Sequence, residues 1–301
     1  MSINNQEKTK VIFDTDIGSD IDDAIALAYL LAQEECDLLG ITTVSGDTIK
    51  RAKLASIFCK IAKQKVPIIA GQENRLDGSS RQPKVPHSLV LSKWEHESKF
   101  SKKNPVEFIA EIVRKYPHQI VLLAVGPMTN IASLFLKYPD IPPLLKSLRL
   151  MAGSFFSVED APIAEWNVYC DPKAAQIIYG TSVSSHTSIG LDVTLKLDMN
   201  PEEVSKRFSH DLLKPIIDMS DIWFSEREKI FFHDPLAALT IFEDNVCTYS
   251  NGLVSIKRSM DRLDGITGLT ENNNGPHSIA TTVNKEIFFE SYFRVFENKI
   301  K

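Results

Sequence analysis

The ten residues DTDIGSDIDD, Asp14–Asp23, follow directly on the apolar run KVIF, Lys10–Phe13. A run of this length and composition is typical of a short buried strand, and the segment after the loop, Ile21–Ala32, has the character of a helix. The loop between strand and helix holds five carboxyl groups, those of Asp14, Asp16, Asp20, Asp22 and Asp23. A strand, an acidic loop and a helix in this order predict the first unit of an α/β protein.

The same alternation continues along the chain. Further strands are expected at Leu38–Val44, Val66–Ala70, Ile120–Val125, Ser147–Met151 and Ser188–Asp192. Helices are expected among them at Ile49–Ala62, Pro105–Lys115, Thr129–Leu136 and Pro172–Tyr179. Short apolar strands that alternate with helices predict an α/β fold with an open, mostly parallel, Rossmann-like sheet and helices on both faces.

The C-terminal third is expected to be more helical. Helices at Asp211–Phe224, Pro235–Ile241 and Glu286–Phe296 are interrupted by strand candidates at Thr248–Ile256 and Ser278–Val283. A chain of 301 residues that is 43% apolar can bury a large core, and no low-complexity linker divides it. We therefore expect a single domain over residues 1–301. Residues 71–104 have no clear periodicity, so this segment is expected to be a functional flap or partly disordered.

Composition argues against several classes of protein. The net charge is −5 and charged residues are mixed along the chain, which disfavours a nucleic-acid binder. No apolar run approaches the roughly 18–20 residues that a membrane span needs, so no membrane association is expected. The polar N-terminus, MSINNQEKTK, does not resemble a secretory signal. Four scattered cysteines without CxxC spacing (Cys36, Cys59, Cys170 and Cys247) favour reduced thiols and a cytoplasmic protein.

The acidic loop is the first place to look for chemistry, because ligands bind beyond the carboxyl ends of strands in open α/β sheets. A helix cap accounts for one acidic residue, such as Asp20, but not for five. Carboxylates this close repel one another and raise one another's pKa unless a cation neutralises them, and Ca²⁺ or Mg²⁺ prefers oxygen ligands. The segment therefore predicts a metal site.

Other acidic or phosphate-binding motifs fit less well. An EF-hand fails because Gly18 occupies the fifth position counted from Asp14. The sequence contains neither a GxGxxG nor a Walker A motif. A strand followed by DTD is also similar to the Mg²⁺-dependent haloacid-dehalogenase-like (HAD-like) phosphatases, in which the first Asp is a nucleophile. Gly18 stands where those enzymes are expected to have Thr or Val, which weakens that alternative.

The loop resembles the DxDxGxDD signature of the inosine-uridine-type nucleoside hydrolases. Similar segments follow in the order of that family, each at a predicted strand end or helix start. They are GITTVSGD (Gly40–Asp47), AVGPMTNIA (Ala124–Ala132), MAGSFF with APIAEWN (Met151–Phe156 and Ala161–Asn167), YCDPKAA (Tyr169–Ala175) and FFHDPLAA (Phe231–Ala238). The resemblance extends through most of the chain, which makes it far more specific than one motif.

The resemblance implies an N-ribosyl hydrolase that splits a ribonucleoside, or a modified ribosyl compound, into free base and ribose. It implies Ca²⁺ bound by Asp16, Asp23, the backbone carbonyl of Thr129 and Asp234. It also implies that Asp22, Glu165 and Asn167 hydrogen-bond the ribose. Asp16 would activate a calcium-bound water, and His233 would assist the departing base.

The chemistry of the residues agrees with these implied roles. Cleavage of an N-ribosidic bond passes through an oxocarbenium-like sugar, as in glycoside hydrolysis. The site needs a base for water, negative charge near the sugar and a hydrogen-bond donor for the leaving base. A cation lowers the pKa of water, and a histidine, which titrates near neutrality, can serve the leaving base.

The sequence departs from the family pattern at several positions. The acidic loop is two residues longer and gains Asp20, so either Asp20 or Asp22 could contact the ribose. Asp47 and Glu159 stand at or near positions where the family has Asn, and both are candidates for substrate binding. The His-Gly-x-Asp-Gly flap of the family is not recognisable in residues 71–104, where His87 and His96 are candidates for its histidine.

Two further expectations concern the ligand and the assembly. Aromatic side chains that could stack on a nucleobase, or equally pack in the core, are Trp166, Trp223, Phe224, Phe231 and Phe232. Family members are usually homodimers or homotetramers, and the resemblance implies the same here. A non-catalytic member that binds calcium and ribose stays open as an alternative, as does the less favoured phosphatase.

Overall fold

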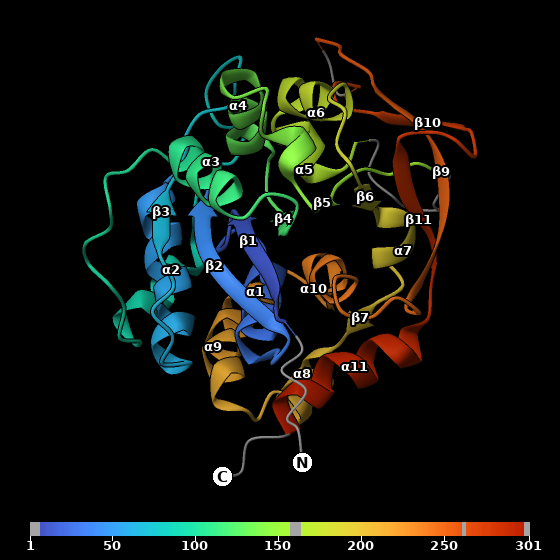
Figure 1. Ribbon diagram of the computed structural model, residues 1–301. Coiled ribbons are helices and arrows are strands. Elements are labelled where there is room, and N and C mark those ends of the chain that lie inside the picture. Colours follow the sequence, from blue (N-terminus) through green and yellow to red (C-terminus); the bar gives the residue numbers. More distant parts are fainter. Residues whose placement is uncertain (1–6, 157–163, 261–262, 298–301) are drawn as a thin grey trace, which may run out of the picture.

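A computed structural model describes residues 7–156, 164–260 and 263–297 (Figure 1). Its centre is a nine-stranded sheet in the order β10-β9-β11-β6-β5-β4-β1-β2-β3. The strands are β1 Thr9–Thr15, β2 Cys36–Thr43, β3 Ile68–Ala70, β4 Ile120–Ala124, β5 Ser147–Met151, β6 His186–Ile189, β9 Cys247–Ile256, β10 Thr267–Glu271 and β11 His277–Val283. A separate short pair is formed by β7 Asp198–Met199 and β8 Ile230–Phe231.

Helices connect the strands. They are α1 Asp22–Ala32, α2 Thr48–Ile61, α3 Pro105–Lys115, α4 Thr129–Lys137, α5 Trp166–Cys170, α6 Pro172–Tyr179, α7 Leu191–Thr194, α8 Pro201–Arg207, α9 Lys214–Trp223, α10 His233–Leu239 and α11 Lys285–Glu297. Three 3₁₀ segments, η1 Pro86–Ser92, η2 Pro142–Leu144 and η3 Asp211–Leu213, complete the described elements. In the part of the chain that the structure describes, we find no helix with the length and apolar character of a membrane span.

Both faces of the sheet are covered, as the apolar strands predict. In β1, Val11 and Phe13 belong to one buried cluster while Ile12 belongs to a second. Because successive side chains of a strand point to opposite faces, the two clusters lie on the two sides of the sheet. Figure 1 shows α3, α4 and α6 on one side and α1, α10 and α11 on the other. The predicted open α/β sheet with helices on both faces is confirmed.

The strand order explains where a cleft can form. β1 pairs in parallel with β2 on one side and with β4 on the other. The chain builds β2 and β3 outward from β1, then returns to place β4 and β5 on its opposite side. This reversal separates the loops that follow β1 and β4, so ligands bind at such a point beyond the carboxyl ends of the strands.

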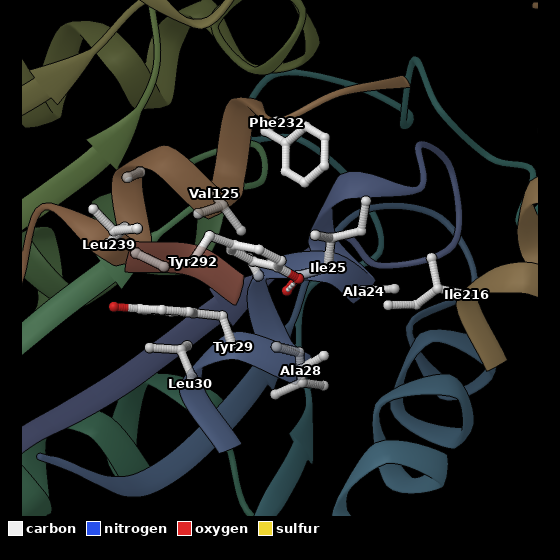
Figure 2. Close-up of a cluster of buried hydrophobic side chains, with 14 of the residues drawn as sticks. Ala24, Ile25, Ala28, Tyr29, Leu30, Val125, Ile216, Phe232, Leu239 and Tyr292 are labelled. Carbon is white, nitrogen blue, oxygen red and sulfur yellow. Dashed lines mark hydrogen bonds between the residues drawn. The ribbon is translucent and has the colours of Figure 1, made fainter. Parts of the chain in front are cut away.

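Helix α1 is buried over its whole length, because it packs between the sheet and the C-terminal helices. Tyr29 stacks on Tyr292 with ring centroids 5.6 Å apart, and the Tyr292 hydroxyl donates to the carbonyl of Ile25 at 3.1 Å. Figure 2 shows these rings beside Ile25, Ala28 and Phe232 in one apolar cluster. This packing fixes the N-terminus of α1, where the acidic loop ends.

Most predicted elements agree with the structure, and the differences have local causes. The predicted strand at Ser188–Asp192 is β6 at His186–Ile189, because the chain turns at Gly190 and begins α7. The predicted helix Asp211–Phe224 is divided into η3 and α9. Elements that were not predicted are short: α5, α7, α8, β7, β8, β10, η1 and η2. The C-terminal third is helical as predicted, and its two predicted strands are β9 and β11, which join the central sheet together with β10.

The segment 71–104 is anchored to the body of the protein and contains η1. Arg81 donates to Asp264 Oδ2 at 2.9 Å and to the carbonyl of Tyr169, and its guanidinium lies over the Tyr169 ring. Ser80 Oγ lies 2.8 Å from Ser45 Oγ in the loop after β2. Of the two alternatives for this segment, the ordered flap agrees with these contacts.

Candidate active site

A cleft of about 960 Å³ opens at the carboxyl ends of the central strands. Its acidic lining comes from Asp16, Asp20, Asp22, Asp23, Glu165, Glu226, Glu228 and Asp234. Its apolar lining includes Val125, Met151, Trp166, Leu191, Leu195, Trp223 and Phe231. The flap contributes Arg81, Gln82, Pro83, Lys84 and Pro86. One cleft therefore joins a carboxylate-rich region to an apolar, partly aromatic one.

Three carboxylates converge where two helices begin. Asp22 and Asp23 lie in the first turn of α1, and Asp234 lies in the first turn of α10. One oxygen of each lies within 4.8 Å of one oxygen of the others, and all three residues are buried. The backbone N–H of Asp234 donates to Asp22 Oδ2 at 3.1 Å, which ties the two helix ends together. Helix N-termini stabilise negative charge, so the two ends support this cluster.

Asp16 lies in the same cleft, although it is not one of the three grouped carboxylates. Its Oδ2 accepts a hydrogen bond from the side-chain amide of Gln82. A Cβ atom added at Gly126 would lie 2.7 Å from Asp16 Oδ1, so the turn after β4 needs glycine for this close approach. The strand end and the turn therefore confine the carboxylate from two sides.

Arg51 of α2 forms hydrogen bonds with the backbone of the acidic loop. Its fully buried guanidinium donates to the carbonyl oxygens of Ser45, Asp16 and Ile17 and, at 2.9 Å, to Ser19 Oγ. These bonds reach the part of the loop that is longer than in the family pattern. Charge-assisted bonds of this kind are among the stronger hydrogen bonds in proteins.

Burial and mutual repulsion shift the carboxyl groups strongly. Burial, followed by the charges of neighbouring carboxylates, raises the pKa of Asp22, Asp23 and Asp234 well above its ordinary value. Burial also raises the pKa of Asp20 to about 6 and that of Glu165 to about 7. A group of buried acids with raised pKa values is the electrostatic environment that a divalent cation neutralises.

Glu165 and Asn167 are fixed by the short helix α5. Glu165 accepts hydrogen bonds from the backbone N–H groups of Asn167 at 2.7 Å, Val168 at 3.0 Å and Gly153 at 3.1 Å. The Asn167 amide donates to the carbonyl of Val125 at 2.6 Å and to that of Met151 at 3.1 Å. Both side chains line the cleft, as the resemblance implied.

His233 also lines the cleft, and its Nδ1 lies 2.7 Å from Thr194 Oγ1. Burial lowers the pKa of His233 to about 4. The expectation that it titrates near neutrality is therefore wrong, because the ring is removed from water. The neutral imidazole offers one N–H donor, and if the Thr194 hydroxyl donates to Nδ1 that donor is Nε2.

Several predicted residues do not reach the cleft. Thr129 is not among its lining residues: Thr129 Oγ1 donates to Asp171 at 2.7 Å, and its carbonyl, at the first position of α4, points along the helix. Asp47 instead caps α2 by accepting from the N–H of Lys50 at 2.9 Å. Glu159 lies outside the described residues.

The flap histidines and two aromatic candidates are also placed elsewhere. His87 is buried beside the cleft, and burial lowers its pKa to about 4, while His96 contacts the carbonyl of Trp94. Phe232 is fully buried in the core (Figure 2). Phe224 does not line the cleft, whereas Trp166, Trp223 and Phe231 do.

Residues that sequence reasoning missed include Gln82, Arg51 and Val125. No motif marks Gln82, because it lies in a segment without periodicity. Arg51 appears in the sequence as an ordinary helix residue. Val125 directly follows β4, and its position just beyond a strand end was the available signal.

Comparisons with known proteins match this chain to one enzyme family over most of its length. The family model described as inosine-uridine preferring nucleoside hydrolase matches residues 11–290. Uridine nucleosidase 1 of Arabidopsis thaliana is 29% identical over 269 residues, which cover 82% of this chain and 78% of the relative. The inosine-uridine preferring nucleoside hydrolase of Leishmania major is 28% identical over 303 residues, 94% of this chain and 95% of the relative.

Solved structures share the fold. A plant nucleoside hydrolase superposes with a TM-score of 0.86 at 22% identity, covering 97% of this chain and 99% of the plant chain. A purine-preferring ribonucleoside hydrolase from Gardnerella vaginalis superposes with a TM-score of 0.82 at 23% identity, covering 95% and 98% of the two chains.

The family match spans nearly the whole chain and includes every segment that carried the resemblance. It leaves the phosphatase alternative without support. The chain belongs to the inosine-uridine preferring nucleoside hydrolase family.

Proposed function

We propose that this protein hydrolyses the N-glycosidic bond of a ribonucleoside, or of a modified ribosyl compound, to free base and ribose. The observation that carries the proposal is the composition of the cleft that contains Asp16, Glu165 and His233. Its carboxylate region suits a polar sugar and a cation, and its region around Trp223, Phe231 and His233 suits a flat, partly polar base. Both regions lie at the strand ends where α/β proteins bind ligands.

The donor set of the cleft fits a calcium ion. Asp22, Asp23 and Asp234 offer oxygens within 4.8 Å of one another, and hard cations such as Ca²⁺ take carboxylate and carbonyl oxygens. Asp16, which the resemblance adds to this set, lies in the same cleft. The carbonyl of Val125 lines the cleft and is a better candidate than that of Thr129. Calcium bound there would supply positive charge that favours ionisation of nearby water and attracts ribose hydroxyls.

The side chains of the cleft have separate roles in the hydrolysis. Asp16 accepts a proton from the water whose oxygen forms the new bond to C1′ of the ribose. The C1′–N bond breaks, its electron pair leaves with the base, and the departing nitrogen takes up a proton from solvent, to which Asp16 afterwards releases its own. Negative charge from the cleft carboxylates stabilises the oxocarbenium-like sugar between these events. Asp20, Asp22, Glu165 and Asn167 hydrogen-bond the ribose and hold C1′ beside the water.

His233 acts at the opposite end of the reacting bond. Its neutral ring can donate an N–H hydrogen bond to a ring nitrogen of the departing base, and Thr194 fixes the orientation of the imidazole. Trp223 and Phe231 line this end of the cleft, and the Phe231 and His233 rings lie 5.5 Å apart. Aromatic faces of this kind stack on nucleobases.

A reducing-sugar assay across common and modified nucleosides, with calcium and with a chelator, tests the proposal. We expect calcium-dependent release of ribose from at least one substrate. Ribose binding by calorimetry without release from any nucleoside would favour the non-catalytic alternative.

We further infer a homodimer or homotetramer located in the cytoplasm. The assembly rests on family membership, and the location is supported by four cysteines that are all buried, free thiols. Light scattering at micromolar concentration and fractionation of cells test these two inferences. A monomer would contradict the first, and recovery outside the cytoplasm would contradict the second.

A further inference from the structure

Gln82 connects the flap to both walls of the cleft. Its side chain is buried, with 7% of the residue exposed, although it belongs to the segment 71–104 that passes over the site. Its Nε2 donates to Asp16 Oδ2, and its Oε1 accepts from the indole N–H of Trp166. Both ends of one amide are therefore used within the cleft.

The partners determine which way the amide points. An indole nitrogen can only donate, so the amide oxygen must face Trp166. An ionised carboxylate can only accept, so the amide nitrogen must face Asp16. Both requirements select the same orientation, which is how the two ends of an amide are assigned from its hydrogen-bond network.

The surroundings hold Gln82 in place. The neighbouring Arg81 ties the flap to Asp264 and to the carbonyl of Tyr169, and Ser80 Oγ accepts from the N–H of Gln82 at 3.0 Å. The Gly46 backbone approaches so closely that an added Cβ would lie 2.5 Å from the Gln82 carbonyl oxygen. Trp166 is half-exposed, at 52%, and lines the cleft between Glu165 and Asn167.

We propose that Gln82 is a positioning residue that holds the Asp16 carboxylate in one orientation, and that Trp166 selects the end of the Gln82 amide that meets Asp16. The proposal rests on the proposed function, because its consequence for catalysis requires Asp16 to accept the proton of water. Gln82 occupies one oxygen of Asp16 and so leaves the other for the reaction. Reacting groups that are displaced by about 1 Å can lose roughly 100-fold in rate.

The test uses Gln82→Met, which keeps the length of the side chain and removes both hydrogen bonds. Measured at saturating calcium, kcat should fall by about 10- to 100-fold, with KM and ribose affinity within about twofold of wild type. Gln72→Met is the matched control. Gln72 lies in the same segment and donates to Ser133 Oγ at 2.6 Å, outside the cleft. Its variant should retain wild-type kcat.

Trp166→Phe separates positioning from packing, because it keeps an aromatic ring and removes the N–H donor. We expect this variant alone to lose about 2- to 10-fold in kcat, the range of one neutral hydrogen bond. In the Gln82→Met background the same change should cost less than about twofold, because Trp166 acts through Gln82. An equal loss in both backgrounds would overturn the assignment of Trp166, and wild-type kcat in Gln82→Met would overturn that of Gln82.

Crystal structures of the calcium-soaked wild type and Gln82→Met supply a readout that does not depend on turnover. We expect the Asp16 carboxylate to be rotated or to occupy more than one orientation in the variant. If it superposes on the wild type as a single conformer, the positioning role is refuted. If the wild type releases no base from any nucleoside, the proposed function fails, and these structures alone decide whether Gln82 orients Asp16.

Discussion

Asp234→Asn should have opposite effects on stability without and with calcium. The three grouped carboxylate oxygens lie within 4.8 Å of one another, and two unit charges at that separation repel by about 3 kcal/mol at an effective dielectric constant of about 20. Proton uptake relieves part of this repulsion, because burial and the neighbouring charges raise the pKa of all three groups. An acidic residue at a helix N-terminus also contributes up to about 1 kcal/mol, which the variant loses. We therefore expect the metal-free variant to be more stable than metal-free wild type by about 1–3 kcal/mol.

With calcium bound, the wild type should instead be more stable than Asp234→Asn. A ligand present at 1,000 times its Kd stabilises the folded state by about 4 kcal/mol, and a variant that binds 100-fold more weakly retains only about 1.4 kcal/mol. Thermal or denaturant unfolding at pH 8, with chelator and with calcium, measures both quantities. Asp140→Asn is the charge-matched control: Asp140 forms an exposed ion pair with Arg114, and its loss should change stability by at most about 1 kcal/mol under either condition. A destabilised metal-free Asp234→Asn with the wild-type response to calcium would refute the reasoning.

Three further outcomes follow from the same structure. Asp16→Asn should lower kcat by about 10²- to 10⁴-fold, and near-normal turnover would exclude Asp16 as the base. His233→Ala should slow nucleosides with poor leaving groups far more than an activated aryl riboside, with calcium affinity nearly unchanged, whereas equal losses on both substrates would reduce His233 to a pocket-shaping residue. His186, buried with neither ring nitrogen hydrogen-bonded, has its pKa lowered by burial to about 3, so the folded state loses stability as pH falls below about 6.5. At pH 5 this cost is about 2 kcal/mol. The free energy of unfolding of His186→Phe should therefore fall by about 2 kcal/mol less than that of wild type between pH 8 and pH 5. An equal fall in both proteins would contradict this role of His186.

The sequence was informative where local pattern and long-range packing agree. Pro105–Lys115, Ser147–Met151 and Pro172–Tyr179 were predicted with the bounds that the structure has, because proline at the helix start and a sharply bounded apolar run define them. The short elements α5 and β10 were missed, because α5 (WNVYC) is little more than one helical turn and β10 (TGLTE) contains one apolar side chain, that of Leu269.

The acidic residues of the site were also predicted from the sequence, because five carboxyl groups within Asp14–Asp23 have no ordinary structural explanation. The expected metal ligands Asp23 and Asp234 do lie together, and the fold adds Asp22 to them through the meeting of two helix ends far apart in the sequence, with Asp16 in the same cleft. Gln82 lines the cleft because the segment 71–104 folds over the site, and no local feature of the sequence predicts this position.

The central claim is that the cleft splits a ribonucleoside with the help of a bound cation. Its most direct test is to incubate the purified wild-type protein with the best nucleoside from the panel and to quantify free base by chromatography and ribose by reducing-sugar assay in the same samples. The structure predicts that base and ribose appear in equal amounts, that a calcium chelator stops their release, and that added calcium restores it. Release of base and ribose at an unchanged rate in the presence of the chelator, or no release from any nucleoside with calcium present, would contradict the claim.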